Sequence, residues 1–281
     1  MGGLGTRLRA LRSALSWGGG IVALVLIAAA AAPVLAPYPY DEMHMADRLQ
    51  PPSARYLLGT DEFGRDVFSR TLLGARLSLF MGFAATAVSL ALGVPLGLIA
   101  GYSKGRLDEI IMRSMDVVMS FPPILLGLLI LAVTPPSLWK TTLAVGLVYV
   151  PAIVRITRSV TLGLREEEFV QAARARGERS LYILVAEILP NAWPPIIVEG
   201  SLRVTFAILL GAALSFLGMG AQPPSSDWGL MISEARPFVD SAPWIAMAPG
   251  LAMCLTVVGV NLLGDGLREV LDPRLPKRGR P

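Results

Sequence analysis

Residues 77–103 read LSLFMGFAATAVSLALGVPLGLIAGYS and contain no charged side chain. An α-helix rises about 1.5 Å per residue, so roughly 20 residues cross a hydrocarbon core about 30 Å thick. The run is therefore long enough to be a transmembrane helix. Gly93, Gly97 and Gly101 recur every four residues, which places three small residues on one face and predicts close packing against another helix.

Runs of the same kind recur along the chain. Four further uncharged stretches are long enough to span a bilayer: 13–40, 117–139, 204–226 and 241–264. A shorter stretch between Lys140 and Arg155 counts as a sixth span, because charged side chains at its ends can extend toward the headgroups. Of the 281 residues, 53% are hydrophobic and 16% charged, with a mean hydropathy of +0.58, whereas soluble domains are about a quarter charged. The composition predicts an all-α integral membrane protein with six transmembrane helices, and it excludes a disordered chain.

The basic residues predict the orientation of these spans. We expect spans at about 16–37, 77–101, 112–134, 139–160, 199–220 and 243–264, which make a transmembrane domain over 16–264. Around them lie an N-terminal tail 1–15, an outer loop 38–76, a cytoplasmic loop 161–195 and a C-terminal tail 265–281. Lys and Arg concentrate in both tails, after the second span and in the loop 161–195, so both termini are predicted to be cytoplasmic. The pI of about 9.5 reflects this topology and does not indicate nucleic-acid binding.

Single residues exclude several classes of site. Cys254 is the only cysteine and lies in an apolar run, so the chain has no internal disulfide, and we expect Cys254 to be a packing residue. His44 is the only histidine, which excludes the HExxH zinc pattern, and we expect it to be a loop residue. The charged residues near the spans are predicted to form two structural ion pairs, Arg113 with Asp116 and Glu199 with Arg203.

The segment 57–79 reads LLGTDEFGRDVFSRTLLGARLSL and lies in the predicted outer loop. Thr60, Asp61 and Asp66 are good helix caps, while Gly59 and Gly64 indicate turns. The apolar pattern after Asp66 predicts a helix that lies along the membrane interface before the chain enters the bilayer. A second outer element extends from Gln222 to Trp244, and its tryptophans suit the headgroup zone.

The segment 165–190 reads REEEFVQAARARGERSLYILVAEILP and lies in the predicted cytoplasmic loop. Glu168 and Arg174 suit the start and end of a short helix, and Gly177 suits its C-terminal stop. Phe169, Ala172, Ala173 and Arg176 fall on one face of that helix. A second helix follows and ends at Pro190. The small-residue face is well shaped to enter a groove on a soluble partner, but a helix resting on anionic lipid fits the composition equally well.

Two sets of motifs resemble a known family. Gln171-Ala172-Ala173, Gly177 and Leu189-Pro190 resemble the EAA loop of ABC importer permeases, with Gln171 where that family usually has Glu. The remaining motifs resemble the second permease subunit of the dipeptide, oligopeptide and nickel ABC importers. They are Leu58–Asp61, Gly64–Asp66, Ser69-Arg70, Gly74–Arg76, Leu214–Gly218, Gln222–Pro224, Trp228-Gly229, Gly264–Arg268 and Leu271–Arg274. The resemblance covers about residues 20–275.

The resemblance implies a type I ABC importer permease fold in the plasma membrane of a bacterium or archaeon. It implies three kinds of protein partner besides membrane lipid: a homologous second permease, two ABC ATPases and an extracytoplasmic binding protein that delivers di- or oligopeptides. The residues expected to couple to the ATPases are Glu168, Gln171, Ala172, Ala173, Arg174, Gly177, Leu189 and Pro190. The outer family motif comprises Gly59, Thr60, Asp61, Gly64, Arg65, Asp66 and Arg70.

The chain itself is not expected to be an enzyme or to bind a cofactor. None of its lysines lies in a GxxxxGK[ST] phosphate loop, so ATP and magnesium are expected in the partner ATPases. Uptake of nickel or another small solute remains an alternative. An ion-coupled secondary transporter is a weaker one, because the two halves of the chain show no inverted repeat. An intramembrane hydrolase lacks the necessary histidine or paired aspartates in the spans.

Overall fold

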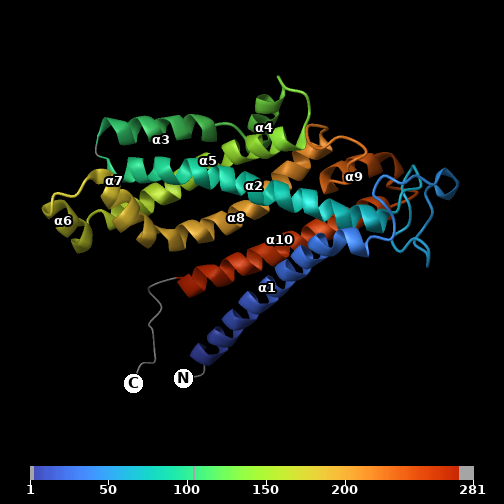
Figure 1. Ribbon diagram of the computed structural model, residues 1–281, viewed down its shortest axis with the longest axis horizontal. Helices are drawn as coiled ribbons and strands as arrows, with labels where there is room; N and C mark the ends of the chain where they lie inside the picture. Colours follow the sequence, from blue (N-terminus) through green and yellow to red (C-terminus); the bar gives the residue numbers. More distant parts are fainter. Residues whose placement is uncertain (1–2, 104, 272–281) are drawn as a thin grey trace.

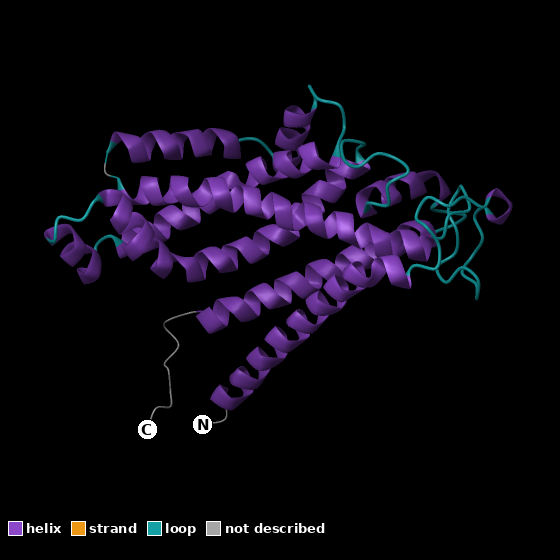
Figure 2. Ribbon diagram, in the orientation of Figure 1, coloured by secondary structure: helices purple, strands orange, loops and turns teal. Residues whose placement is uncertain are grey.

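The computed structural model describes residues 3–103 and 105–271, with side chains from Ser16 onward, and shows an elongated bundle of helices (Figure 1). Within those ranges the chain forms helices and loops without a β-strand (Figure 2). The α-helices are α1 Gly3–Leu35, α2 Val67–Tyr102, α3 Arg106–Met119, α4 Pro123–Leu131, α5 Leu138–Leu164, α6 Glu168–Ala175, α7 Ser180–Tyr182, α8 Leu189–Phe216, α9 Trp228–Ala235 and α10 Trp244–Leu271. The predicted C-terminal motif beyond Leu271 lies outside the described residues.

Five helical segments are long and apolar enough to cross a membrane. They are Ser16–Leu35, Val67–Tyr102, Leu138–Leu164, Ser180–Phe216 and Trp244–Leu271. A sixth crossing exists if α3 and α4 count as one broken span, since they bend by 91° at a short break. We expected one helix over 112–134, but Pro122 and Pro123 interrupt it. Proline has no N–H to donate and disfavours helical geometry in the residue before it, so α3 ends at Met119 and α4 starts afresh at Pro123.

The glycine face of α2 packs against α5, which confirms the close approach expected from the sequence. A Cβ atom placed on Gly93, Gly97 or Gly101 would lie 2.6 Å from a side-chain atom of Ile153, Thr157 or Thr161. Real Cβ atoms do not approach that closely, so only glycine permits this helix spacing. These two helices form the centre of the bundle, and α8 packs against both.

Helices α1 and α10 form a separate pair that diverges from the rest of the bundle toward one end (Figure 1). Gly18 on α1 lies against the backbone of Leu262 and Leu263, and Gly259 on α10 lies against Ile21. Cys254 is exposed on α10, so it is not the packing residue that we expected within this chain. Its apolar surroundings in the sequence reflect an outward-facing helix rather than a buried one.

Two predicted helix boundaries differ from the structure. Helix α2 runs without a break from Val67, so the expected interfacial helix is the first part of the span itself. The helix expected to end at Pro190 instead continues to Phe216. Residues Ile183–Ile188 form a π-helical turn that ends two residues before this proline. The wider turn accommodates a residue that lacks a donor and crowds the preceding carbonyl groups.

Candidate functional site

The α6 segment, residues 165–190, lies at one end of the bundle (Figure 1). Val170 and Ala173 are fully buried on α6, and Phe169 is half-buried beside them. They pack against a core formed by α2, α5, the π-helical turn and α8, whose buried members are Val94, Leu98, Ile153, Ile183, Ile188, Ala192 and Ile196. The short helix is therefore seated on the bundle by one apolar face.

The opposite face of α6 is exposed. Gln171, Ala172 and Ala175 have open side chains, whereas Ala173 is fully buried. We expected Ala172 and Ala173 to share one docking ridge, and this was wrong. Adjacent residues on a helix point about 100° apart, so Ala173 is buried against the bundle while Ala172 is exposed.

Gly177 ends α6 as the sequence predicted. Its φ angle is +78°, and a Cβ atom there would meet nothing within 4 Å. The N–H of Gly177 donates to the Arg174 carbonyl at 2.9 Å, and that of Glu178 donates to the Ala173 carbonyl at 3.2 Å. This pair of bonds is the Schellman motif, in which glycine adopts a left-handed conformation and closes the helix.

Several side chains of the expected coupling set bond within the chain. The Arg174 guanidinium lies 4.9 Å from the centre of the Tyr102 ring on α2, and Gln171 donates to the Glu166 carbonyl at 2.9 Å. Leu189 is half-buried against the core, while Glu168 and Pro190 are exposed. The structure thus brings the set together at one end of the bundle, with some members facing inward and others outward.

The outer family motif forms a buried ionic cluster at the opposite end of the bundle. Arg65 donates to Asp61 at 2.6 Å and to Glu234 at 3.1 Å. Arg70 donates to the same Glu234 oxygen at 2.9 Å and lies 3.6 Å from Asp61. Both arginine side chains are 1% exposed, so water does not solvate these charges. We call Asp61, Arg65, Arg70 and Glu234 the buried cluster.

The rest of the motif shapes the loop around this cluster. Gly59 and Gly64 have φ angles of +74° and +73°, which confirms the predicted turns. Asp66 caps α2 by accepting from the Ser69 N–H at 2.8 Å, as expected. Burial raises the pKa of Glu62, which adjoins the cluster. The sequence did not indicate Glu234, because it stands in no motif and its partners are far away along the chain.

A second buried contact joins α2 to α9. Asp227 caps α9 by accepting from the Leu230 N–H and accepts a further bond from the Ser78 hydroxyl at 3.1 Å. The Trp228 indole donates to the Thr71 carbonyl at 2.9 Å, and its side chain is 1% exposed. Trp228 is therefore enclosed by the protein, and its place relative to the headgroups stays a prediction. Burial raises the pKa of the Asp227 carboxyl group.

Three ion pairs lie on α3, α5 and α8. The Glu199–Arg203 pair is confirmed at 2.7 Å, and the Arg203 guanidinium also stacks over Tyr149 and Phe206. The expected Arg113–Asp116 pair is wrong, because α3 lies along α5 and Asp116 reaches across to Arg155 at 2.6 Å. Asp108 binds Arg158 through both carboxylate oxygens, each at 2.6 Å.

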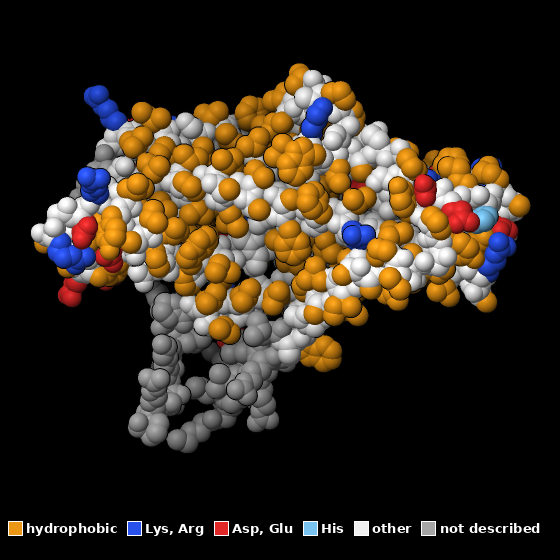
Figure 3. Space-filling view, viewed as in Figure 1, with side chains coloured by type: hydrophobic (Ala, Val, Ile, Leu, Met, Phe, Trp, Pro, Cys, Tyr) orange, Lys and Arg blue, Asp and Glu red, His pale blue; other side chains and the backbone are white. Residues whose placement is uncertain are grey.

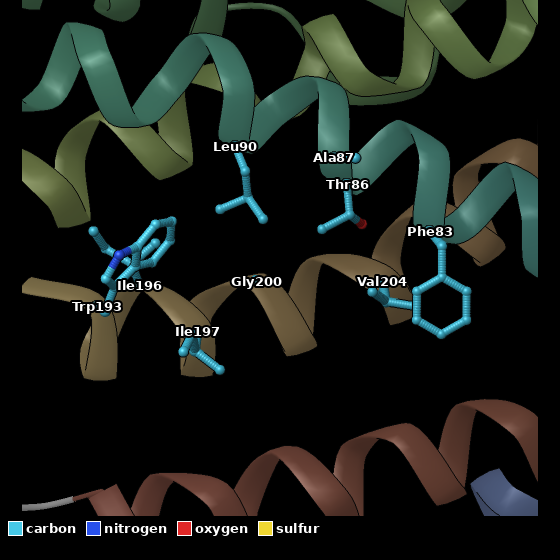
Figure 4. A pocket seen from close by; sticks show the side chains of 9 residues that line it. All are labelled: Phe83, Thr86, Ala87, Leu90, Trp193, Ile196, Ile197, Gly200 and Val204. Atoms are coloured by element: carbon cyan, nitrogen blue, oxygen red, sulfur yellow. The ribbon is translucent and has the colours of Figure 1, made fainter. Parts of the chain in front are cut away.

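Two grooves open elsewhere on the surface and are apolar. One of about 260 Å³ lies between α2 and α8, where Phe83, Leu90 and Trp193 contribute to its walls (Figure 4). Its one hydroxyl, on Thr86, already donates to the Gly82 carbonyl. The other, about 670 Å³, lies among α1, α2 and α10. The space-filling view shows hydrophobic side chains over most of the length of this face (Figure 3).

Comparison with known proteins identifies the family. A family model described as "Binding-protein-dependent transport system inner membrane component" matches residues 93–277, and one for the N-terminal TM domain of oligopeptide transport permease C matches residues 6–52. The dipeptide transport system permease DppC of Alkalihalophilus pseudofirmus is 46% identical over 91% of this chain and 84% of its own length. A di/tripeptide permease DppC of Pseudomonas aeruginosa is 43% identical over 92% and 88%. The glutathione permease GsiD of Pectobacterium atrosepticum is 43% identical over 95% and 89%.

The fold agrees with a solved transporter. An inward-facing structure of the MetNI methionine ABC transporter aligns with a TM-score of 0.58 at 17% identity, covering 69% of this chain and 93% of its own. At that identity the match shows a shared fold, which is the type I importer permease fold expected from the sequence. The chain is a multi-pass membrane protein that belongs to the family of binding-protein-dependent transport system inner membrane components, the permeases of ABC importers.

Proposed function

We propose that this chain forms half of the translocation pathway of an ATP-driven importer of di- and oligopeptides. Relatives at 41–46% identity over most of the chain are named as permeases for dipeptides, for di- and tripeptides or for glutathione. These substrates are all short peptides with charged groups. Their shared chemistry supports peptides over nickel.

The seating of α6 is the observation that carries the proposal. Val170 and Ala173 fix one face of the helix to the bundle, while Gln171, Ala172 and Ala175 leave the other face open. An exposed helix face with small side chains suits insertion into a groove on an ATPase subunit. Force applied to α6 would reach the spans through the core that holds Val170 and Ala173.

The proposed mechanism is a two-state movement driven by the partners. Closure of the paired ATPases on ATP would displace α6 together with the inner ends of α2, α5 and α8, and so favour one state of the pathway over the other. ATP and magnesium belong to the partners in this scheme, and the chain needs no cofactor of its own. A second, homologous permease supplies the other half of the pathway.

The proposed orientation puts α6 in the cytoplasm. The beginning of α1 and the end of α10 extend toward the same end of the bundle as α6, which supports cytoplasmic termini (Figure 1). The loop that holds the buried cluster then faces the outside, where a binding protein would deliver the peptide. The concentration of arginine in loop 161–195 agrees with this orientation.

Purification of the tagged chain from its native membrane in mild detergent tests the proposal. We expect mass spectrometry to find a second permease and two ATPases, and proteoliposomes containing this complex and the binding protein to take up a labelled dipeptide only with ATP. Isolation of the chain alone, with uptake that follows a proton gradient, would contradict it. ATP-driven uptake of nickel instead of peptide would overturn the substrate but not the permease role.

A further inference from the structure

Two ion pairs lie toward the middle of long helices, although the sequence placed Arg155 at the end of a span. Pro151 is the middle residue of α5, and Arg155 is four residues away, or about 6 Å along the axis. Arg203 lies at the middle of α8. The hydrocarbon core is about 30 Å thick, so both guanidinium groups fall inside it if these helices cross the membrane along most of their length. Ionisable groups at this depth are costly in lipid and generally face protein or a water-filled cavity.

Both pairs border the same open face of α5. The opposite face of this helix, with Ile153 and Thr157, packs on the glycines of α2. Tyr149, Ala152 and Arg155 lie away from that contact. On one side, Arg155 pairs with Asp116 of α3, with side chains 46% and 44% exposed.

On the other side of this face, Arg203 stacks over Tyr149 and pairs with Glu199. The two charged side chains are 19% and 20% exposed. Neither pair is as enclosed as Arg65 and Arg70, whose side chains are 1% exposed. Both offer a guanidinium and a carboxylate to whatever occupies the space in front of α5.

Other surfaces of the molecule are apolar. Residues 16–35 of α1 and 244–264 of α10 carry no charged side chain. The grooves between α2 and α8 and among α1, α2 and α10 are apolar. Lipid tails suit those surfaces, whereas they do not suit exposed ion pairs. The contrast indicates that the open face of α5 meets water rather than lipid.

We propose that the open face of α5, between the Arg155–Asp116 and Arg203–Glu199 pairs, lines the aqueous pathway and binds the charged ends of the peptide. The proposal rests on the proposed peptide substrate. Peptides of different sequence share a terminal carboxylate, a terminal ammonium and the backbone. The guanidinium groups of Arg155 and Arg203 suit the carboxylate, and the carboxylates of Asp116 and Glu199 suit the ammonium.

Cysteine labelling in the assembled complex tests whether this face meets water. Ala152 lies between the two pairs, and cysteine is close to alanine in size. The chain carries its own control, because Cys254 is exposed on the apolar side. The complex with Cys254→Ala and Ala152→Cys is compared with the wild-type complex, using a membrane-impermeant thiosulfonate and mass spectrometry of this chain.

We expect position 152 to react at least about tenfold faster than Cys254, because the reactive thiolate forms in water and not in lipid. Dipeptide and loaded binding protein should slow the labelling at 152. Equal, slow labelling at both positions, in a complex that takes up peptide, would overturn the inference and leave the proposed function standing. Failure of ATP-driven peptide uptake by the wild type would instead contradict the proposed substrate, and with it the assignment of peptide ends.

Charge variants in the Ala152→Cys background separate peptide binding from a structural role. Arg155→Gln and Arg203→Gln should each leave the rate of labelling at position 152 unchanged without peptide. Each should weaken the protection by dipeptide by about tenfold, because one strong contact to the peptide is lost. Arg158→Gln is the matched control, since Arg158 lies on the same helix and pairs with Asp108 rather than with a carboxylate of the proposed site. Protection that survives both test variants, or that Arg158→Gln reduces as much, would overturn the peptide-binding role.

Discussion

The buried cluster and the α6 segment sit at opposite ends of the bundle, and both carry family motifs, yet they use their residues differently. In the cluster, Arg65 and Arg70 are 1% exposed and form ion pairs with Asp61 and Glu234. On α6, Gln171 and Ala172 are exposed although the helix beneath them is anchored.

The difference separates two kinds of motif. Side chains whose polar groups are hydrogen-bonded inside the chain stabilise its fold, and their loss lowers the free energy of unfolding. Exposed side chains on a helix that is anchored to the bundle can contact a partner, and their loss lowers the recovery of the assembled complex. Variants at the two ends should therefore differ in what they disturb as well as in how much.

The largest effect is expected from Arg65→Ala in the buried cluster. The change leaves Asp61 and Glu234 with one guanidinium instead of two, and removal of one partner of a buried pair costs about 3–5 kcal/mol. We expect a lower midpoint of thermal unfolding and a reduced yield of assembled complex. Arg55→Ala is the control, because Arg55 pairs with Asp47 at the surface and its side chain is 60% exposed. Equal behaviour of the two variants would contradict a structural role for the cluster.

The two adjacent alanines of α6 should respond differently to the same substitution. Ala173→Trp forces a large ring into a filled core and should cost about 1–3 kcal/mol of stability or more, measured by unfolding of the purified chain. Ala172→Trp should leave stability unchanged and lower the recovery of ATPase subunits by at least about tenfold, which corresponds to 1.4 kcal/mol of binding. A stability loss at Ala172, or normal ATPase recovery, would contradict the assignment of its face to docking.

Local patterns in the sequence predicted much of the fold. Apolar runs located the spans, the spacing of Gly93, Gly97 and Gly101 predicted a close helix contact, and Gly177 predicted the end of α6. Each of these depends on neighbouring residues, whose geometry the helix itself determines. The family resemblance added the grouping of motifs at the two ends.

Long-range partners could not be predicted in the same way. Asp116 has an arginine at helical spacing, yet it pairs with Arg155 because α3 lies along α5. Glu234 joins the buried cluster from α9, and no spacing rule connects it to Arg65. The division of Ala172 and Ala173 between solvent and core likewise depends on how α6 is seated.

Gly177→Val should have a smaller effect than the changes above. A residue other than glycine at φ +78° costs about 1–2 kcal/mol, and the space around it is open, so the penalty is conformational and not steric. We expect the strain to shift α6 on its seat and reduce ATP-driven uptake while the chain still inserts. Gly177→Asn should retain more activity, because asparagine tolerates the left-handed conformation better. Similar uptake by both variants would contradict the conformational explanation.

The smallest effect is expected at the contact between Arg174 and Tyr102, which joins α6 to α2. A cation–π pair at an exposed site contributes about 0.5–1 kcal/mol, so Arg174→Met and Tyr102→Leu should each destabilise only slightly. The coupling energy from a double-mutant cycle, measured by unfolding of the two single variants and the double variant, should fall in that range. A coupling energy of several kcal/mol would contradict this expectation, because the contact would then be as strong as an ion pair of the buried cluster. A weak contact instead agrees with an α6 segment held chiefly by the apolar seat of Val170 and Ala173, leaving its outer face for the partner.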